Sequence, residues 1–230
     1  SKLALTIPFW LNKNTAYLAF DNNKERGRFA REQGEALQYQ LYEAGGIAHL
    51  APGYEKLIKV GAEGIIDEVD ALERQTDDPA KHEFYRSVKI AMSALSEFGD
   101  RYATEATRLA TEESDPQRKA ELERIAEICT RVPRKGATCF YEAVQSMTLA
   151  HIAIFQETTG ETTCPGRIDQ FLNPYFEKDL AEGRITREEA KEILGAFCVT
   201  LCETIPVWPE TTGAMLGGMT RWEVIPIGGP

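Results

Sequence analysis

The chain has 230 residues, of which 43% are hydrophobic and 27% charged, an ordinary composition for a soluble globular protein with a substantial core. Its 26 basic and 36 acidic side chains give a formal net charge of −10, and a surface of this sign repels phosphate backbones and anionic lipid. The charge therefore argues against nucleic acid and membrane as partners, and no apolar run reaches the roughly 18 residues that span a bilayer.

Helical patterns begin early in the chain. Residues 1–44 read as an irregular arm and a first helix from Arg28 to Tyr42, which ends at a glycine pair as helices commonly do. A glycine-rich loop follows, and helical stretches begin at Tyr54 and at Gly64.

Two helices after these have recognisable start signals. Asp77-Asp78-Pro79 supplies capping residues and a proline near the first turn. Apolar side chains then recur at three- and four-residue steps and predict one continuous stripe: Phe84, Val88, Ala91 or Met92, Leu95, Phe98, Tyr102 and Leu109. Ser114 and Gln117 match a capping box around Pro116 and predict the second start, and Pro133 closes that helix.

The last predicted helices differ in how much of their surface is apolar. The segment TCFYEAVQSMTLAHIAIFQE is apolar almost all round, so we expect a helix buried on most sides. A capping box from Thr186 to Glu189 opens another helix, which ends before Pro206. Only RWEVIPI, near the C-terminal end, suggests an extended segment.

This organisation predicts a mainly α chain. It has an arm and first helix in 1–44, a helical part in 45–205 and a Gly- and Pro-rich end in 206–230. A self-contained domain seldom finishes in roughly twenty-five such residues without a pairing partner. We therefore expect the chain to be the first part of something larger.

The cysteines indicate a reducing compartment. They are odd in number and mostly lie in apolar helical patterns, which favours buried, reduced thiols in the cytosol: Cys129, Cys139, Cys164, Cys198 and Cys202. Cys198 and Cys202 could share a metal, but no histidine or further cysteine nearby completes a site, so we interpret both as core residues and expect no metal. The N-terminal SKLALTIPFW lacks a small-residue cleavage site and does not resemble a signal peptide.

The three histidines have different settings. His49 follows two glycines in a loop, where it either caps a neighbouring helix or acts on a substrate as a ligand or proton carrier. His82 lies in a charged helix start, where we expect it to be solvated. His151 lies in an apolar helix, which favours a hydrogen-bonded core histidine.

Three carboxylates come near the candidate loop. We expect Glu142 to pair with Gln145 on a helix face, and Glu157 to end the buried helix. Glu161 begins the loop and could point into a cavity. Acids alone do not define acid–base catalysis, so none is assigned a catalytic role from the pattern.

The sequence TCPGRID raises the question of a reactive thiol at Cys164. Reactive thiols need a helix N-terminus or a cation nearby, and Arg167 is three residues away. Asp169 is a closer partner for that arginine and could also cap the following helix. We therefore favour a structural corner held by an Arg167–Asp169 salt bridge.

The chain resembles the N-terminal half of the glycyl radical enzymes, the pyruvate formate-lyase-like proteins, through motifs in the family's order: GGIAHLAPGYEKLIKVGAEGII, ELERIAEICTRVP, TCFYEAVQSMTLAHIAIFQE and PGRIDQFLNPYFEKDLAEGRITREEAKEIL. The resemblance covers nearly all of residues 40–205. GRIDQFLNPYFEKDL is similar to the signature of the branch that contains glycerol and choline lyases, hydroxyproline dehydratase and arylacetate decarboxylases. It implies that residues 1–230 are the N-terminal part of a pyruvate formate-lyase-like domain, whose full fold is a ten-stranded α/β barrel.

The resemblance also implies a mechanism whose reactive groups lie elsewhere. In the family a glycine radical near the C-terminus passes to a cysteine in a Gly-Cys-x-Glu loop, and neither motif is present here. The implied reaction is radical cleavage of a C–C, C–O, C–N or C–S bond in a small polar substrate. The chain alone is expected to be inactive, with no catalytic residue and no bound cofactor.

The resemblance further implies partners and a location. A radical S-adenosylmethionine activating enzyme with an iron–sulfur cluster would install the glycyl radical in the full-length protein. That protein would be a homodimer in the cytoplasm or in a bacterial microcompartment, under anaerobic conditions.

The residues that this chain would contribute form one wall of the substrate cavity. The family's substrate-contacting positions match His49 in the glycine-rich loop and Glu161, Thr162 and Thr163 before the Pro-Gly-Arg corner. The glycerol-processing branch has His-Ser where this chain has Glu-Thr. This difference argues against glycerol and for a cationic or hydroxylated substrate, which a carboxylate can bind. Alternative readings are a formate acetyltransferase proper, or a non-catalytic helical remnant that acts as a binding or scaffold protein.

Overall fold

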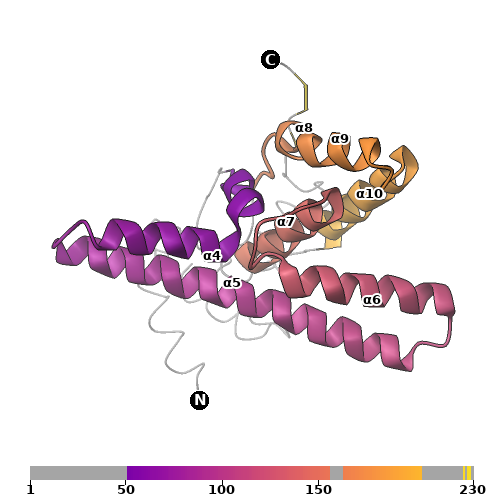
Figure 1. The fold of residues 1–230 in the computed structure, drawn as a ribbon, viewed down its shortest axis with the longest axis horizontal. Coiled ribbons are helices and arrows are strands. Elements are labelled where there is room, and N and C mark those ends of the chain that lie inside the picture. Colours follow the sequence, from indigo (N-terminus) through magenta and orange to yellow (C-terminus); the bar gives the residue numbers. More distant parts are fainter. Residues whose placement is uncertain (1–50, 156–162, 204–224, 226, 229–230) are drawn as a thin grey trace, which may run out of the picture. The chain divides into compact units, whose positions relative to one another are not determined.

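The structure, a computed structural model, describes residues 51–155, 163–203, 225 and 227–228. Within these ranges the chain is mostly helical and has no strand beyond a single bridge residue at Thr163. The helices, labelled as in Figure 1, are α4 (Tyr54–Glu73), α5 (Pro79–Glu112), α6 (Pro116–Arg131), α7 (Phe140–Phe155), α8 (Ile168–Phe171), α9 (Asn173–Ala181) and α10 (Arg187–Glu203). The mainly α character is therefore confirmed for this part of the chain, whereas the helix predicted over Arg28–Tyr42 lies outside it.

The chain divides into two compact units. The larger contains Gly53–Ala153, Arg167–Val199 and Ile227–Pro230, and it holds most of the helices. The smaller contains Ser1–Pro52, Ile154–Gly166 and Thr200–Pro226, of which the structure describes only short stretches. The predicted segment boundaries after residues 44 and 205 lie outside the described residues and stay predictions.

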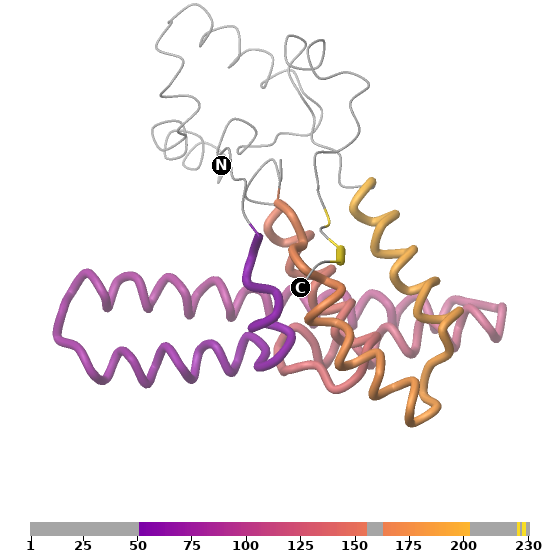
Figure 2. Tube along the Cα trace, turned by 90° about the horizontal axis from the view of Figure 1, so that it is seen from above, coloured from indigo at the N-terminus to yellow at the C-terminus, as the bar shows by residue number. Residues whose placement is uncertain are grey.

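Helix α5 is the longest element of the larger unit, with 34 residues. Helix α4 packs against it on the side of its first turns and α6 on the side of its last turns, each running antiparallel to it (Figures 1 and 2). The predicted start is confirmed, because the Asp78 carboxylate accepts a hydrogen bond from the Ala80 N–H at 2.9 Å and Pro79 is the first helical residue.

The apolar stripe predicted on α5 is only partly buried. Phe84 is 64% exposed and Tyr102 is 41% exposed. The buried face consists instead mainly of small residues: Leu95, Ser96, Gly99, Ala103, Ala106 and Ala110. A Cβ on Gly99 would lie 2.9 Å from the Cδ of Pro133, so the small side chains are what allows this close approach. The periodicity identified the helix but selected the wrong residues for part of its core face.

The cap predicted for α6 was also wrong by one residue. Asp115, not Ser114, is the N-cap, and its carboxylate accepts from the Gln117 N–H at 3.0 Å. The Ser114 N–H donates instead to the Glu113 carboxylate at 2.7 Å. Pro116 immediately follows Asp115 and is the first helical residue, the position that proline favours.

Gly61 interrupts α4, with φ 72° and ψ 174°, a combination that is essentially restricted to glycine. The interruption separates the two helical stretches expected from Tyr54 and from Gly64. It also frees backbone groups that pair with the α6–α7 connection: Ala62 N to Pro133 O at 2.9 Å, Glu63 N to Arg134 O at 3.0 Å and Ala137 N to Ile58 O at 2.8 Å. A Cβ at Gly61 would lie 2.4 Å from the backbone carbon of Lys135, so the two segments meet backbone to backbone.

Helix α7 is buried on most sides, as its sequence predicts. Its first turn is capped from a distant helix, because the Asp179 carboxylate of α9 accepts from the Phe140 N–H at 2.7 Å. Asp179 is 3% exposed and pairs with Arg184 at 2.5 Å. A carboxylate at a helix N-terminus is favourable, so this contact joins α9 to the start of α7.

Helix α10 begins as predicted, since Thr186 and Glu189 exchange the hydrogen bonds of a capping box. Its core face carries Ala190, Phe197 and Leu201. Cys198 and Cys202, interpreted from the sequence as core residues, are exposed because they lie on another face of the helix.

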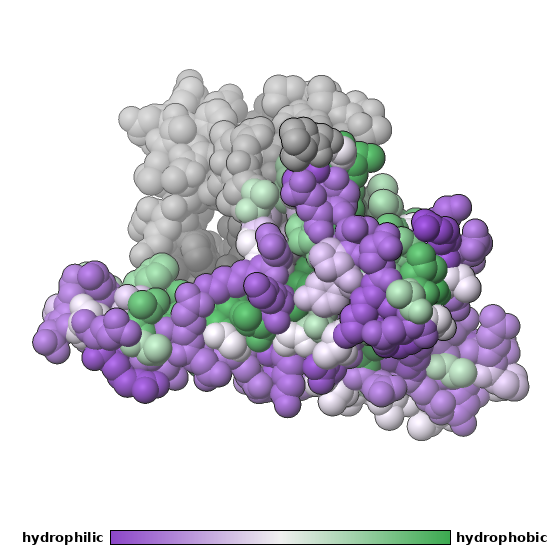
Figure 3. Space-filling view, turned by 45° about the horizontal axis from the view of Figure 1, so that its top comes forward, coloured by the Kyte–Doolittle hydropathy of each residue, from purple (hydrophilic) through white to green (hydrophobic). Residues whose placement is uncertain are grey.

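The described surface is mostly hydrophilic in the view of Figure 3, where hydrophobic side chains form small separate patches. No helix in the described ranges is both long and apolar enough to cross a membrane.

Candidate functional site

Thr163 is the predicted site residue that the structure describes. It is 1% exposed and stands directly before Cys164, Pro165 and the turn residue Gly166. His49, Glu161 and Thr162 lie outside the described residues. Their predicted roles therefore stay predictions, and the site is built here from the residues that flank them.

The two predicted substrate segments are flanked by residues that lie close together within the smaller unit. A Cβ placed on Gly166 would lie 3.6 Å from the Cβ of Ala51, an ordinary contact distance. Ala51 comes two residues after His49, and Gly166 comes three residues after Thr163. Gly166 has φ +79°, a left-handed conformation that glycine adopts without strain, so the chain can turn sharply at this point.

The corner that follows is held by the predicted salt bridge. The Arg167 guanidinium donates two hydrogen bonds to the Asp169 carboxylate, both at 2.9 Å. Asp169 does not cap the helix, as the sequence suggested, because it lies inside the first turn of α8 and accepts instead from the Gly228 N–H at 3.0 Å. The neighbouring Arg167 guanidinium, together with this N–H, lowers the pKa of Asp169 to about 2.

This pairing bears on Cys164, which is half-buried. The cation that could have activated the thiol forms a bidentate ion pair with Asp169, which in turn raises the pKa of Arg167. A guanidinium so engaged is a structural element of the corner. The observed geometry agrees with the prediction of a structural corner and gives no support to a nucleophilic thiol.

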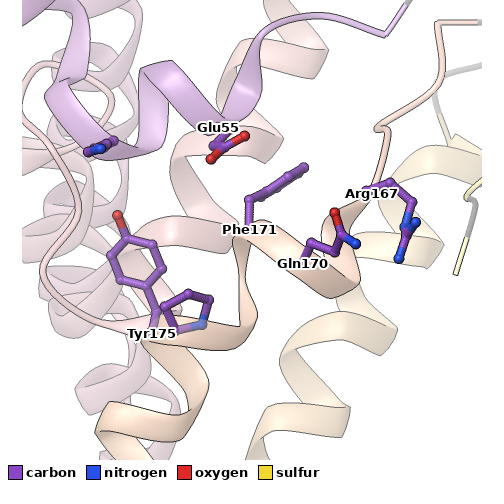
Figure 4. A pocket seen from close by; sticks show the side chains of 7 residues that line it. Glu55, Arg167, Gln170, Phe171 and Tyr175 are labelled. Atoms are coloured by element: carbon purple, nitrogen blue, oxygen red, sulfur yellow. The ribbon is translucent and has the colours of Figure 1, made fainter. Parts of the chain in front are cut away.

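A pocket of about 360 Å³ lies beside this corner in the larger unit and was not predicted from the sequence. Its lining comes from the first turns of α4, from the N-cap residue of α8, and from α8 and α9: Glu55, Lys59, Arg167, Gln170, Phe171, Pro174 and Tyr175. Figure 4 shows the Glu55 carboxylate near the Phe171 ring, with the Tyr175 hydroxyl pointing toward α4. Burial and, to a lesser degree, the Glu55 charge raise the pKa of Tyr175. No motif marks this pocket, because it forms only when three helices meet.

His151 is a hydrogen-bonded core residue, as predicted. It is 1% exposed, and its Nδ1 lies 2.8 Å from the Tyr54 hydroxyl. The imidazole ring also lies edge-on to Phe197, with ring centroids 6.4 Å apart. His82 is only half-exposed, since it contacts the Glu73 carboxylate at 3.3 Å.

Glu142 is bound differently from the prediction. Its carboxylate accepts from the Thr138 N–H at 2.6 Å and hydroxyl at 2.8 Å, and from Arg131 at 3.2 Å, rather than pairing with Gln145. The Glu142 carboxylate therefore ties Thr138, which precedes α7, to the first turn of that helix. Glu157 lies outside the described residues.

Among the residues that are described, no three His, Cys, Asp or Glu side chains group as a metal site would require.

Comparison with known proteins places these features in a family. The model of the family described as "Pyruvate formate lyase-like" matches residues 2–230. The isethionate sulfite-lyase of Nitratidesulfovibrio vulgaris is 36% identical over 184 residues, which are 76% of this chain and 22% of that enzyme. The (2S)-3-sulfopropanediol dehydratase of Klebsiella oxytoca is 37% identical over 193 residues, 81% of this chain and 23% of that enzyme.

A solved structure agrees with these matches. The glycyl radical enzyme from Archaeoglobus fulgidus superposes with a TM-score of 0.65 and 35% identity, over 86% of this chain and 25% of that one. The chain thus spans about a quarter of the length of the proteins that it matches.

Proposed function

Because this chain belongs to the pyruvate formate lyase-like family, we propose that it is the N-terminal part of a glycyl radical lyase or dehydratase and supplies one wall of the substrate cavity. In this proposal the remaining length of the enzyme completes the barrel and carries the catalytic cysteine and the radical glycine. The full-length enzyme is a cytoplasmic homodimer, and its radical is installed by an activating enzyme that uses S-adenosylmethionine.

The wall consists of His49 on one segment and Glu161, Thr162 and Thr163 on the other. The observation that carries the proposal is the short distance between Ala51 and Gly166, which flank these two segments. Two chain segments that meet next to their polar residues can present both sets of side chains to one ligand. The Arg167–Asp169 pair, with two hydrogen bonds at 2.9 Å, follows shortly after this segment in the sequence.

The proposed substrate is a small hydroxylated molecule. A carboxylate at Glu161 accepts a hydrogen bond from a substrate hydroxyl, and charge-assisted bonds of this kind are stronger than neutral ones. The relatives named for isethionate and for a sulfopropanediol favour a short polar compound whose C–S or C–O bond is cleaved. Glycerol is not expected to be turned over.

The test uses the full-length enzyme, activated without oxygen. We expect a glycine-centred doublet in its electron paramagnetic resonance spectrum and turnover of isethionate or (2S)-3-sulfopropanediol, but not of glycerol. Glu161→Gln should raise the KM for the substrate without reducing the radical signal. Glu177→Gln is the matched control, because it makes the same change from carboxylate to carboxamide at an exposed residue of α9. It should leave the KM unchanged. A normal radical signal with no change of KM in Glu161→Gln would refute the proposed wall.

A further inference from the structure

A row of apolar residues runs along α5 beside the face that packs against the other helices. Helices α4 and α6 lie along the same side of α5 (Figure 1), where its buried residues are mostly small. The neighbouring row, called the seam below, recurs at alternating steps of four and three residues: Phe84, Val88, Ala91, Leu95, Phe98, Tyr102, Glu105 and Leu109. Its one charged member, Glu105, forms an ion pair with Arg108 of the same helix at 2.7 Å. A strict repeat of seven residues is the pattern by which two helices pair in a coiled coil.

Much of the seam is exposed in the part of the chain that the structure describes. Phe84 is 64% exposed, Tyr102 41% and Leu109 38%, and Ala91 is exposed as well. The middle of the seam is covered within the chain, since Leu95 is 8% exposed. The row is about 38 Å long at 1.5 Å per residue. An apolar row of this length on a surface is typical of a site that a protein partner covers.

The exposed residues of the seam are placed symmetrically about the midpoint of residues 84–109. Phe84 lies as far before this point as Leu109 lies after it, and Ala91 as far before it as Tyr102 after it. When two copies of α5 pair antiparallel about this point, Phe84 faces Leu109 of the second copy and the small Ala91 faces the bulky Tyr102. Alternating large and small side chains fill an interface well. This register pairs all four exposed apolar residues.

The charges of α5 favour the same antiparallel pairing. Its first half, residues 79–96, carries three basic and one acidic side chain, whereas its second half, residues 97–112, carries two basic and four acidic side chains. Antiparallel copies bring each basic half against an acidic half, and Lys81 comes to lie opposite Glu112. A parallel pair would place like charges together, which is unfavourable.

We propose that the seam of α5 is an interface between two copies of this chain, related by a two-fold axis through the midpoint of residues 84–109. A second copy fits better than a different partner, because the apolar residues and the charges of one helix complement those of its own antiparallel copy. The inference rests on the proposed function only in giving a surface to the homodimer, and it involves no residue of the substrate wall.

The first experiment measures the dimer dissociation constant of the full-length enzyme by sedimentation equilibrium before activation. Phe84→Lys and Leu109→Glu should each raise this constant at least about 100-fold, because two-fold symmetry repeats each change at two places in the interface, at about tenfold each. Ile90→Lys is the matched control. Ile90 is 62% exposed but lies on another face of α5, so its substitution should leave the constant unchanged.

The double variant Phe84→Lys/Leu109→Glu separates a lost interface from a damaged helix. In the antiparallel register the new ammonium faces the new carboxylate at both ends, so the double variant should dimerise at least about tenfold more tightly than either single variant. A helix that is merely destabilised, or that is covered by the rest of the enzyme, gains nothing when the two changes are combined. A monomeric unmodified enzyme, single variants that dimerise normally, or a double variant as weak as the single ones would each overturn the inference.

The result is distinguishable from a failure of the proposed function, because dissociation is measured without substrate or radical. The glycine-centred signal and turnover are then recorded on the same preparations. An enzyme that dimerises through the seam but shows neither would refute the proposed function and support this inference. Normal turnover with a dimer that does not depend on the seam would do the reverse.

Discussion

Replacing Gly61 with alanine tests how the interruption of α4 is accommodated. The new Cβ would lie 2.4 Å from the carbonyl carbon of Lys135 and 2.5 Å from the carbonyl oxygen of Arg134, both of which are backbone atoms. Neither can rotate away as a side chain would, so the α6–α7 connection must shift as a whole. The φ of 72° adds a conformational cost that glycine does not have.

The expected loss of stability follows from these two effects. A non-glycine residue in this backbone region costs about 1–3 kcal/mol. A shifted connection also weakens three backbone hydrogen bonds, each worth about 1 kcal/mol net. We therefore expect Gly61→Ala to lower the free energy of unfolding by about 4 kcal/mol, a large share of the roughly 5–15 kcal/mol typical of a domain.

A substitution at a second glycine separates the cost of the backbone conformation from the cost of the close backbone contact. Gly183 also has a positive φ, of 66°, but a Cβ there would meet nothing within 4 Å. Gly183→Ala should therefore cost only about 1–2 kcal/mol. Urea unfolding followed by circular dichroism gives both values from the midpoint and slope. If Gly61→Ala proved no more destabilising than Gly183→Ala, the backbone contact described for α4 would be wrong.

Three further predictions concern caps and charges. Asp179→Ala should lower the free energy of unfolding by about 3 kcal/mol in the same assay, because it leaves the buried Phe140 N–H without its acceptor, whereas a loss below about 1 kcal/mol would contradict the cap. Asp115→Ala should lower the free energy of unfolding by about 1 kcal/mol, and Ser114→Ala should hardly change it. A larger loss for Ser114→Ala than for Asp115→Ala would support Ser114 as the cap, as expected from the sequence. The pKa of Asp169 in the folded protein, about 2, lies below the ordinary aspartate pKa of 3.8, so the stabilising contribution of the carboxylate is present above about pH 4 and is lost as the pH falls toward 2. An Asp169→Asn variant should lack this part of the acid dependence, and unchanged acid unfolding would contradict the pairing with Arg167.

Helix starts were predicted best where the signal is local. The Asp78 cap with its following proline and the Thr186–Glu189 box both depend on residues within one turn, and both are confirmed. The α6 start shows the limit of such patterns. Ser114 and Asp115 are adjacent capping residues, and the pattern chose the one whose spacing to Gln117 fits a box.

Buried faces were predicted less well, because they depend on distant partners. The large apolar residues of α5 suggested the stripe, yet the close approach of Pro133 selects Gly99 and its small neighbours for the interface. Cys198 and Cys202 were interpreted as core residues because they are apolar, but α10 turns Phe197 toward the core instead. Periodicity gives the helix, and tertiary packing decides which face is covered.

In the candidate site, too, contacts between residues close in sequence could be predicted and contacts between distant residues could not. The Arg167–Asp169 pair could be predicted, since its members are two residues apart. The link from Asp169 to Gly228 and the bond between Tyr54 and His151 could not, because they join residues separated by 59 and 97 positions. Sequence motifs carry no information about such pairings until the helices are placed.

The central claim is that residues of this chain form a wall of the substrate cavity in a glycyl radical enzyme. A crystal structure of the full-length enzyme with its substrate bound, determined without oxygen, tests it most directly. We predict polar atoms of the substrate within hydrogen-bonding distance of His49 and of at least one of Glu161, Thr162 and Thr163. A substrate bound out of reach of both segments would contradict the account.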